Sequence, residues 1–507
     1  MTNPIFTASD PSGTVVTHSG ILTILQWLSE PSALEAADEL PLLRANLKAL
    51  RDVGGSLQQR VRALDGLYQR SFPVIDRLLP SLAEIGLPIP GKARRTARSL
   101  LDLLQMLADD TLAMPEGIDR ANAIDPSLAL DLTLWRGINA LARQLMISHL
   151  IASPARAGVW QQLHQTFASA RMQRLHTVVP KGASNTAQHI YNAAILLGCA
   201  QPASLTARQV LFLADYFERF ADQLEPISAA AAVAPGTFWI DRQRDVPAIS
   251  CAHKLAPQTT SLDGFSCARL TRLLKTQIAE LERGTPAQAI GLPEYADTPA
   301  GLGVLRRLAS RWTDSGKRRF QRRRQNNRTV LSSGIDDLWR LCQKGEEARD
   351  LDLSTWMITN ESPDGYAVMH VAGRTGALSV GDVVAVRTGS EQNWQVCLVR
   401  WAISENPEHL ELGLQILGPK AVPAIIAQPS EKLGTEHLRA LILPEIPLLR
   451  ANQLLVVAAG TLPAQRHKMV LVIEQGNLMV REVKRTHIDE QTGTVDILSI
   501  EADDNPL

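Results

Sequence analysis

The chain has 507 residues, which at roughly 150 residues per domain corresponds to about three folded units. Its 52 Lys and Arg residues balance 52 Asp and Glu residues, which excludes a uniformly basic nucleic-acid coat and an acidic disordered tail. Apolar residues make up 45% of the chain and charged residues 21%, which excludes a wholly disordered protein.

The sequence shows neither a secretion signal nor a membrane span. The N-terminus MTNPIFTASDPSG lacks a basic stretch followed by an apolar one, and no run of about 18 apolar residues is free of charge. We therefore expect a cytoplasmic protein. The five cysteines are widely spread without a C-x-x-C pair, and no H-E-x-x-H occurs, so we predict neither a disulfide framework nor a metal site.

The first part of the chain has a helical pattern. Residues 1–40 are rich in Pro, Ser, Thr and Gly and predict a loosely organised segment. Over residues 41–300, apolar side chains recur every three or four positions, as Leu43, Leu47 and Leu50 do, and Gly or Pro separates the stretches. Helices packed on helices bury such stripes most simply. We predict one or more α-helical domains over 41–300, which bind a protein partner that the sequence does not identify.

One segment in this part resembles a phosphate-binding loop. Residues 86–92, GLPIPGK, match the first seven positions of G-x-x-x-x-G-K. However, Ala93 replaces the hydroxyl that would bind magnesium, and Pro88 and Pro90 remove two backbone donors. We interpret the segment as a turn between helices. Since no catalytic motif occurs elsewhere, we predict that the protein is not an enzyme and that it has no cofactor.

A basic segment separates the helical part from a β-rich part. From Arg306 to Arg328, ten Lys or Arg residues stand against one acid, Asp314, so we predict a basic linker over 301–328. Beyond it the apolar period becomes two, the period of half-buried strands. We predict two β units, a barrel or sandwich over 329–420 and a second small β-rich domain over 430–507. The fold class is therefore multidomain α + β.

Two short motifs flank the start of the first β unit. Arg324-Gln325-Asn326-Asn327-Arg328 is an R-x-x-x-R, and Asn360-Glu361-Ser362-Pro363-Asp364-Gly365 is an N-x-S-x-x-G. The arginine run contains other registers of the first motif, and we take the pair nearest the strands. Alone, the second motif suits a plain hairpin turn, because Asn, Pro, Asp and Gly all favour turns.

In this order, and followed by alternating strands, the motifs resemble those of the PilZ domain family, bacterial receptors for cyclic di-GMP. The later segments Val399-Arg400-Trp401 and Leu412 to Leu417 also resemble strands of that family. The resemblance implies a six-stranded antiparallel β-barrel over 329–420 with cyclic di-GMP as its ligand. The binding residues that it implies are Arg324, Arg328, Asn360, Ser362 and Gly365, with Arg323 as an extra contact to a stacked ligand dimer. Between the motifs, residues 329–359 leave room for an insertion near Ile335 to Glu347.

The chemistry of these residue types suits such a ligand. The arginine guanidinium pairs bidentately with phosphate or with the Hoogsteen edge of guanine. Asn360 and Ser362 are two apart, so an extended backbone directs both toward one face, where a guanine edge can hydrogen-bond to them. Gly365 permits a tight turn and a close backbone approach.

We therefore predict a cyclic di-GMP receptor in which ligand binding rearranges the helical domain and acts on a partner in motility, biofilm formation, pilus function or secretion. One alternative is a nucleic-acid-binding protein that uses the arginines of residues 306–328, although nucleic acid is not the partner that we expect. The other alternative is a PilZ-like interaction scaffold that binds no ligand.

Overall fold

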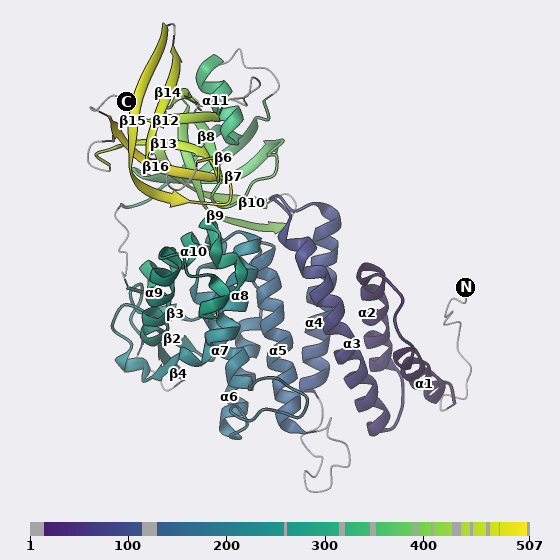
Figure 1. Cartoon of the computed structure of the whole chain (residues 1–507). Helices are drawn as coiled ribbons and strands as arrows, with labels where there is room; N and C mark the ends of the chain where they lie inside the picture. Colours follow the sequence, from purple (N-terminus) through teal and green to yellow (C-terminus); the bar gives the residue numbers. More distant parts are fainter. Residues whose placement is uncertain are drawn as a thin grey trace.

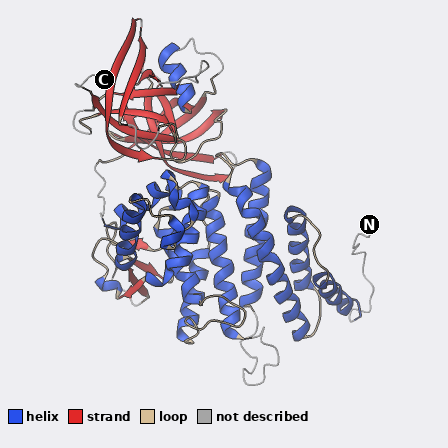
Figure 2. Cartoon of the chain, viewed as in Figure 1, coloured by secondary structure: helices blue, strands red, loops and turns tan. Residues whose placement is uncertain are grey.

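A computed structural model describes residues 15–113, 129–257, 261–313, 320–344, 351–388, 394–406, 409–427, 438–446, 450–462, 467–475 and 477–503. Helices α1 to α10, within residues 15–313, gather in one body, and most strands form a second body above them, together with helix α11 (Ile335–Lys344), in the view of Figures 1 and 2. The predicted α + β class, with a helical region followed by two β units, is confirmed. Among the described residues, no helix has both the length and the apolar character that crossing a bilayer requires.

The helical body begins with a series of antiparallel and crossing helices whose apolar stripes face one another. Its first eight helices are α1 (Val15–Ser29), α2 (Ala36–Asp52), α3 (Leu57–Ala83), α4 (Gly91–Leu112), α5 (Leu130–Leu150), α6 (Val159–Met172), α7 (Ala187–Cys199) and α8 (Ala207–Phe220). Two of them start with capping boxes, Ser56 with Gln59 and Thr206 with Gln209, in which side chains satisfy the free backbone N–H groups of the first turn.

A small sheet and two more helices complete the helical body. The sheet has the order β1-β4-β2-β3, with strands β1 (Glu225–Ile227), β2 (Thr237–Asp241), β3 (Ile249–Ser250) and β4 (Leu262–Ser266). The helices are α9 (Ala268–Glu282) and α10 (Pro299–Thr313). Short 3-10 turns lie at 202–204, 221–223, 229–231, 287–290 and 294–297. The region predicted as purely α-helical therefore contains a four-stranded sheet.

The first barrel is closed and antiparallel in the order β10-β7-β6-β5-β8-β9. Its strands are β5 (Arg323–Ser333), β6 (Ser354–Ser362), β7 (Gly365–Gly373), β8 (Val383–Thr388), β9 (Gln395–Asn406) and β10 (His409–Gly418). Trp356 and Ile358 alternate inward along β6 and are almost fully buried. Helix α11 (Ile335–Lys344) forms the predicted insertion between β5 and β6.

The second barrel is also closed, with the order β11-β12-β13-β16-β15-β14. Its strands are β11 (Val422–Ala427), β12 (Leu438–Leu443), β13 (Gln453–Ala458), β14 (Lys468–Gln475), β15 (Asn477–Gln491) and β16 (Val495–Ala502). A cluster of buried side chains that includes Leu338 and Leu341 of α11, Val383 and Leu398 of the first barrel and Leu443 of the second joins the barrels. The insertion helix thus packs at the contact between the barrels.

The helical body and the first barrel share one continuous apolar core. The turn between α3 and α4 contains residues 86–90 of the loop-like segment 86–92, and there Leu87 forms a β-bridge with Leu378. The N–H of Leu87 donates to the carbonyl of Leu378 at 2.7 Å, and the N–H of Leu378 donates back at 2.9 Å. On β9, the N–H of Ser404 donates to the carbonyl of Ala152 at 2.8 Å. The interpretation as a turn is confirmed for residues 86–90, whereas residues 91–92 begin α4, and the turn also contacts the barrel.

Two predictions of loose structure need correction. Within the segment 1–40, residues 15–29 form α1, where Ile21 and Ile24 are buried in the core. Within the predicted linker 301–328, residues 301–313 belong to α10, and β5 begins at Arg323. Apolar side chains of α10, including Leu305 and Leu308, are buried, so tertiary packing holds this arginine-containing stretch as a helix.

Candidate ligand-binding site on the first barrel

The N-x-S-x-x-G segment forms the turn between β6 and β7. Ser362 pairs with Gly365 across this turn. The hydroxyl oxygen of Ser362 lies 2.6 Å from an acceptor oxygen of Asp364 and 3.1 Å from the carbonyl oxygen of Gly365. The serine hydroxyl therefore stabilises the turn through local hydrogen bonds, as serine commonly does in hairpins.

Gly365 is required by a close approach between strands. A methyl group at this position would overlap the carbonyl oxygen of Leu414 on β10 and would lie 3.3 Å from the Cα atom of Gln415. Gly365 is not among the glycines with positive φ, so backbone conformation alone does not select it. The absence of a side chain lets β7 and β10 meet beside the turn.

A cavity of about 310 Å3 opens next to this turn. Its walls come from Arg322, from side chains within residues 360–367, from Arg400 and Trp401 of β9, and from residues 413–415 of β10. A methyl group on Gly413 would overlap the indole ring of Trp401, so the ring lies across this glycine. The cavity thus combines two aromatic side chains, two guanidinium groups, the carboxylates of Glu361 and Asp364, and amide and hydroxyl groups.

Three β-bulges border the cavity. One lies on β5 between Arg324 and Asn327, and a second lies on β6 between Ile358 and Asn360. In the third, Arg400 is the extra residue of β9 opposite β10. A bulge bends its strand and changes the direction of the side chains near it. Regular alternation therefore does not determine which side chains reach the cavity.

The arginines predicted from the sequence lie along one edge of this region. Arg324 is paired with Asn360 across β5 and β6, and Arg323 is paired with Glu361. Arg328 lies beyond the bulge, opposite Met357. All three arginines are exposed, and none of them lines the cavity, whereas Arg322 does. The structure therefore brings Asn360, Ser362 and Gly365 together in the cavity wall, with Arg324 on the adjacent strand.

Sequence reasoning did not select four residues that line the cavity, namely Arg322, Arg400, Trp401 and Gln415. The segments that contain Arg400 and Gln415 resemble strands of the PilZ family, which was the available signal. The guanidinium of Arg400 donates from Nε to Gln415 at 2.5 Å and from Nη1 to both carboxylate oxygens of Glu490 at 2.6 Å each. Glu490 belongs to β15, so a cavity residue is tied directly to the second barrel.

The basic stretch 306–328, which the nucleic-acid-binding alternative uses, is divided between α10 and β5. Arg306 forms an ion pair with Glu282 at 2.7 Å. Arg311 donates to the carbonyl of Ala200 and to Ser204, both at 2.8 Å. Arg311 thus turns toward the protein, whereas Arg306 is exposed but already paired with an acid. Three further basic residues fall outside the described part of the chain, namely Lys317, Arg318 and Arg319.

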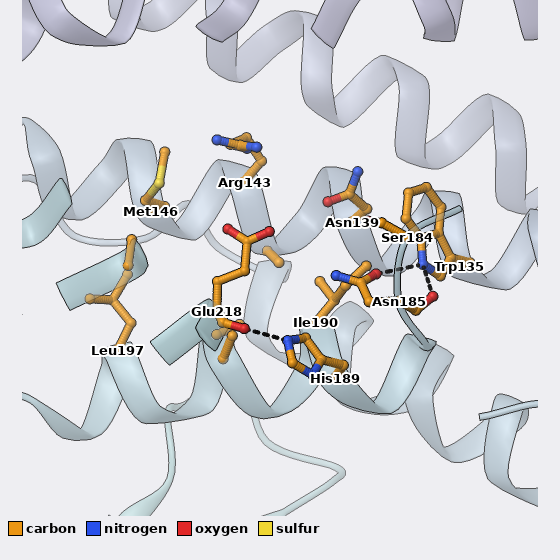
Figure 3. A pocket seen from close by; sticks show the side chains of 14 residues that line it. Trp135, Asn139, Arg143, Met146, Ser184, Asn185, His189, Ile190, Leu197 and Glu218 are labelled. Atoms are coloured by element: carbon orange, nitrogen blue, oxygen red, sulfur yellow. Dashed lines mark hydrogen bonds between the residues drawn. The ribbon is translucent and has the colours of Figure 1, made fainter. Parts of the chain in front are cut away.

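A second cavity, of about 230 Å3, lies among α5, α7 and α8 (Figure 3). Three of its polar side chains have the following partners. The indole N–H of Trp135 lies 3.1 Å from both acceptor oxygens of Asn185, and a ring nitrogen of His189 lies 2.5 Å from the carbonyl oxygen of Glu218. Arg143 is 3.2 Å from Asp76. This cavity offers one paired guanidinium, so it suits a dianionic ligand less well than the barrel cavity does.

The structure shows no arrangement that suits a metal ion in the part of the chain that it describes, since no three His, Cys, Asp or Glu side chains gather there. All five cysteines lie in described segments and are free thiols.

Two family models match regions of this chain. Residues 340–423 match the family model described as "Cyclic-di-GMP receptor FimW, middle PilZ domain", and residues 23–230 match the model of the FimW N-terminal domain. A curated relative, the cyclic-di-GMP receptor FimW of Pseudomonas aeruginosa strain PAO1, is 22% identical over 406 residues. That similarity covers 64% of this chain and 65% of the relative's own length.

One solved structure, that of the Bacillus subtilis inhibitor of motility MotI/DgrA, is also similar in part. The similarity covers 36% of this chain and 90% of that protein at 15% sequence identity. Its TM-score is 0.12, which is too low to support any statement about this chain.

Proposed function

The first barrel belongs to the PilZ domain family, and on this premise we propose that the chain is a cyclic di-GMP receptor that binds its ligand at the barrel cavity. The observation that carries the proposal is the position of the N-x-S-x-x-G residues. Asn360, Ser362 and Gly365 line a single cavity together with Arg322 and Arg400. The family models that match the helical part and the barrel both describe a receptor for the same nucleotide.

The groups at the cavity match the parts of this ligand. Cyclic di-GMP carries two phosphates and two guanines. Arg322 and Arg400 supply positive charge for a phosphate, and exposed Arg323, Arg324 and Arg328 extend that charge along β5. The amide of Asn360 accepts from and donates to a guanine edge, as the proposal requires. The indole of Trp401 offers a flat surface for a base.

We infer that binding is coupled to the other domains through Arg400. This side chain holds Glu490 of the second barrel, and Glu490 also lies 3.8 Å from Arg307 of α10. A phosphate that attracts Arg400 would weaken this connection between three domains. A shift in population from 1:99 to 99:1 requires about 5.5 kcal/mol of differential binding. Two to four charge-assisted hydrogen bonds, at about 1.5–3 kcal/mol each, are sufficient.

We assign the downstream role to the helical part. Its match to the N-terminal domain of a cyclic-di-GMP receptor supports a role as the module that contacts a protein partner. In this proposal the protein acts as a binding protein in the cytoplasm, and its output lies in motility, biofilm formation, pilus function or secretion.

Calorimetric titration of the full chain with cyclic di-GMP tests the proposal, with GTP and cyclic di-AMP as controls. We expect saturable binding of cyclic di-GMP alone. Arg328→Ala and Asn360→Ala should each weaken binding about tenfold to a hundredfold, the cost of one hydrogen bond to a charged group. Arg340→Ala is the matched control, because Arg340 is an exposed arginine on α11 away from the cavity.

Unchanged affinity in Arg328→Ala and Asn360→Ala would refute the assignment of the site. Competition with unrelated oligonucleotides distinguishes the nucleic-acid alternative, because phosphate-dominated binding is indifferent to the base and falls steeply with salt. If oligonucleotides displace cyclic di-GMP at moderate salt, that alternative is favoured. If neither ligand binds, the chain is a scaffold without this ligand.

A further inference from the structure

The helical body, the first barrel and the second barrel meet at a cluster of arginines. Arg307 and Arg311 come from α10, and Arg400 comes from β9. Between them lies a small cavity that Ser204 of the helical body and Thr492 of the second barrel also line. This junction is separate from the barrel cavity described above, although the side chain of Arg400 lies between the two.

The positive charge at the junction exceeds the negative charge. Glu490 is the one acidic residue that lines the cavity, and both of its carboxylate oxygens are 2.6 Å from Arg400. Arg311 donates to the carbonyl of Ala200 and to the hydroxyl of Ser204, which are neutral groups. With three guanidinium groups and one carboxylate among the lining residues, the formal charge is 3 − 1 = +2.

Arg307 is the least satisfied of the three arginines. Its two acceptors are Gln209 at 3.5 Å and Glu490 at 3.8 Å. Charge-assisted hydrogen bonds of arginine measure about 2.7–2.9 Å, so both contacts are long. The side chain is nevertheless only 27% exposed. A guanidinium that is only partly exposed and that has no close acceptor leaves donors available to a bound anion.

The electrostatics agree with this geometry. Burial, together with the positive charges of Arg307 and Arg400, lowers the pKa of Arg311 to about 10. Burial, followed by the repulsion of Arg400, also lowers the pKa of Arg307, although Glu490 opposes the change. Both groups remain protonated at neutral pH, so their mutual repulsion destabilises the junction until an anion compensates it.

The cavity is small and therefore selects a small anion. Its volume is about 40 Å3, and one water position needs roughly 10–15 Å3, so it holds about three or four water-sized groups. A tetrahedral oxyanion presents four oxygens. Paired guanidinium donors favour such an anion over chloride because they bond to two oxygens at once.

We propose that the junction of Arg307, Arg311 and Arg400 is a binding site for a phosphate-type oxyanion, which holds α10 against both barrels. Inorganic phosphate and the terminal phosphoryl group of a nucleotide share this chemistry. Bound there, the anion accepts hydrogen bonds from Arg307 and Arg311 and offsets the excess charge. Arg400 also lines the barrel cavity, but Arg307 and Arg311 do not, so the proposal rests on these two arginines and not on the proposed function.

The test is the thermal unfolding midpoint and calorimetric titration of the full chain with inorganic phosphate, against sodium chloride at equal ionic strength. We expect phosphate to raise the midpoint and to bind the wild-type chain. Arg307→Gln and Arg311→Gln should each weaken phosphate binding at least tenfold. Arg306→Gln is the matched control, because its side chain is on the same helix but is paired with Glu282.

GMP and guanosine form the second arm of the test, since only GMP carries a phosphoryl group. Binding of GMP but not guanosine, lost in Arg307→Gln, identifies a nucleotide phosphate as an occupant of the same site. Two results overturn the proposal: equal phosphate stabilisation in wild type and Arg307→Gln, or no effect of phosphate or GMP beyond that of chloride. Arg307→Gln keeps the test valid if Arg311→Gln fails to fold, because Arg307 makes no close hydrogen bond in the described structure.

Discussion

Replacement of Gly365 by alanine should destabilise the first barrel although the change adds only one methyl group. The new Cβ atom would overlap the carbonyl oxygen of Leu414 and would lie 3.1 Å from its carbonyl carbon. All of the nearest atoms belong to the backbone of β10, so no side-chain rotation can relieve the overlap. β7 and β10 would have to separate by on the order of 1 Å at a point where their residues are paired.

The expected cost follows from overpacking. Extra groups forced into a well-packed site typically cost about 1–3 kcal/mol. In a unit of 150–250 residues, each kcal/mol lowers the unfolding midpoint by about 2–4 °C, so Gly365→Ala should lower it by about 2–12 °C. Because the same strands form the cavity wall, affinity for cyclic di-GMP should fall as well.

Differential scanning fluorimetry of both variants measures this effect. Gly493→Ala is the control, because a methyl group at Gly493 meets nothing within 4 Å and its φ is not positive. Its midpoint should stay within about 1 °C of wild type, in line with the small effects of most surface substitutions. A Gly365→Ala midpoint equal to that of Gly493→Ala would refute the close approach of β7 and β10.

Three further predictions concern charge and burial. Glu490→Gln should raise the affinity for cyclic di-GMP a few-fold in calorimetry, because it releases Arg400 from a carboxylate; an unchanged or weaker affinity would contradict the coupling. Burial raises the pKa of the Cys199 and Cys397 thiols. Ellman's reagent should therefore modify these thiols at pH 8 only after denaturation. Their rapid reaction in the folded protein would contradict their burial. Burial lowers the pKa of His149 to about 4, whereas the unfolded chain binds that proton near pH 6.5, so stability should fall as the pH drops from about 6.5 to 4. Urea denaturation at several pH values measures the free energy of unfolding, and its decrease toward pH 4 should be smaller in His149→Gln than in the wild type. An identical pH profile in the two proteins would contradict the burial of His149 as the cause.

Regular periodicity explains which elements were predictable. Leu410, Leu412 and Leu414 alternate along β10 and are buried in the barrel, as the sequence predicts. Helix α1 was missed because its sequence VVTHSGILTILQWLS is rich in β-branched residues, which are weak helix formers. Packing of Ile21 against the core overrides this local preference. Residues 301–313 of α10 were predicted as a linker because of their arginines, although the same stretch carries a stripe of apolar residues that are buried.

The cavity was predictable only in part. The turn residues Asn360 and Gly365 follow from a local motif, since a hairpin fixes their positions. Strand alternation does not predict the position of the Arg400 side chain, because Arg400 is the extra residue of a bulge, and alternation carries no information about where a bulge falls. Its partner Glu490 is 90 residues away in the sequence, in a different barrel.

The bridge between Leu87 and Leu378 bears on the order in which the chain can fold. These residues are 378 − 87 = 291 positions apart, and ribosomes add about 5–20 residues per second. During synthesis, roughly 15–60 s therefore pass before Leu378, the partner of the backbone N–H and C=O groups of Leu87, exists. The helical part must remain soluble in that interval with one end of its core uncovered, so truncation before the first barrel should produce a chain that depends on chaperones.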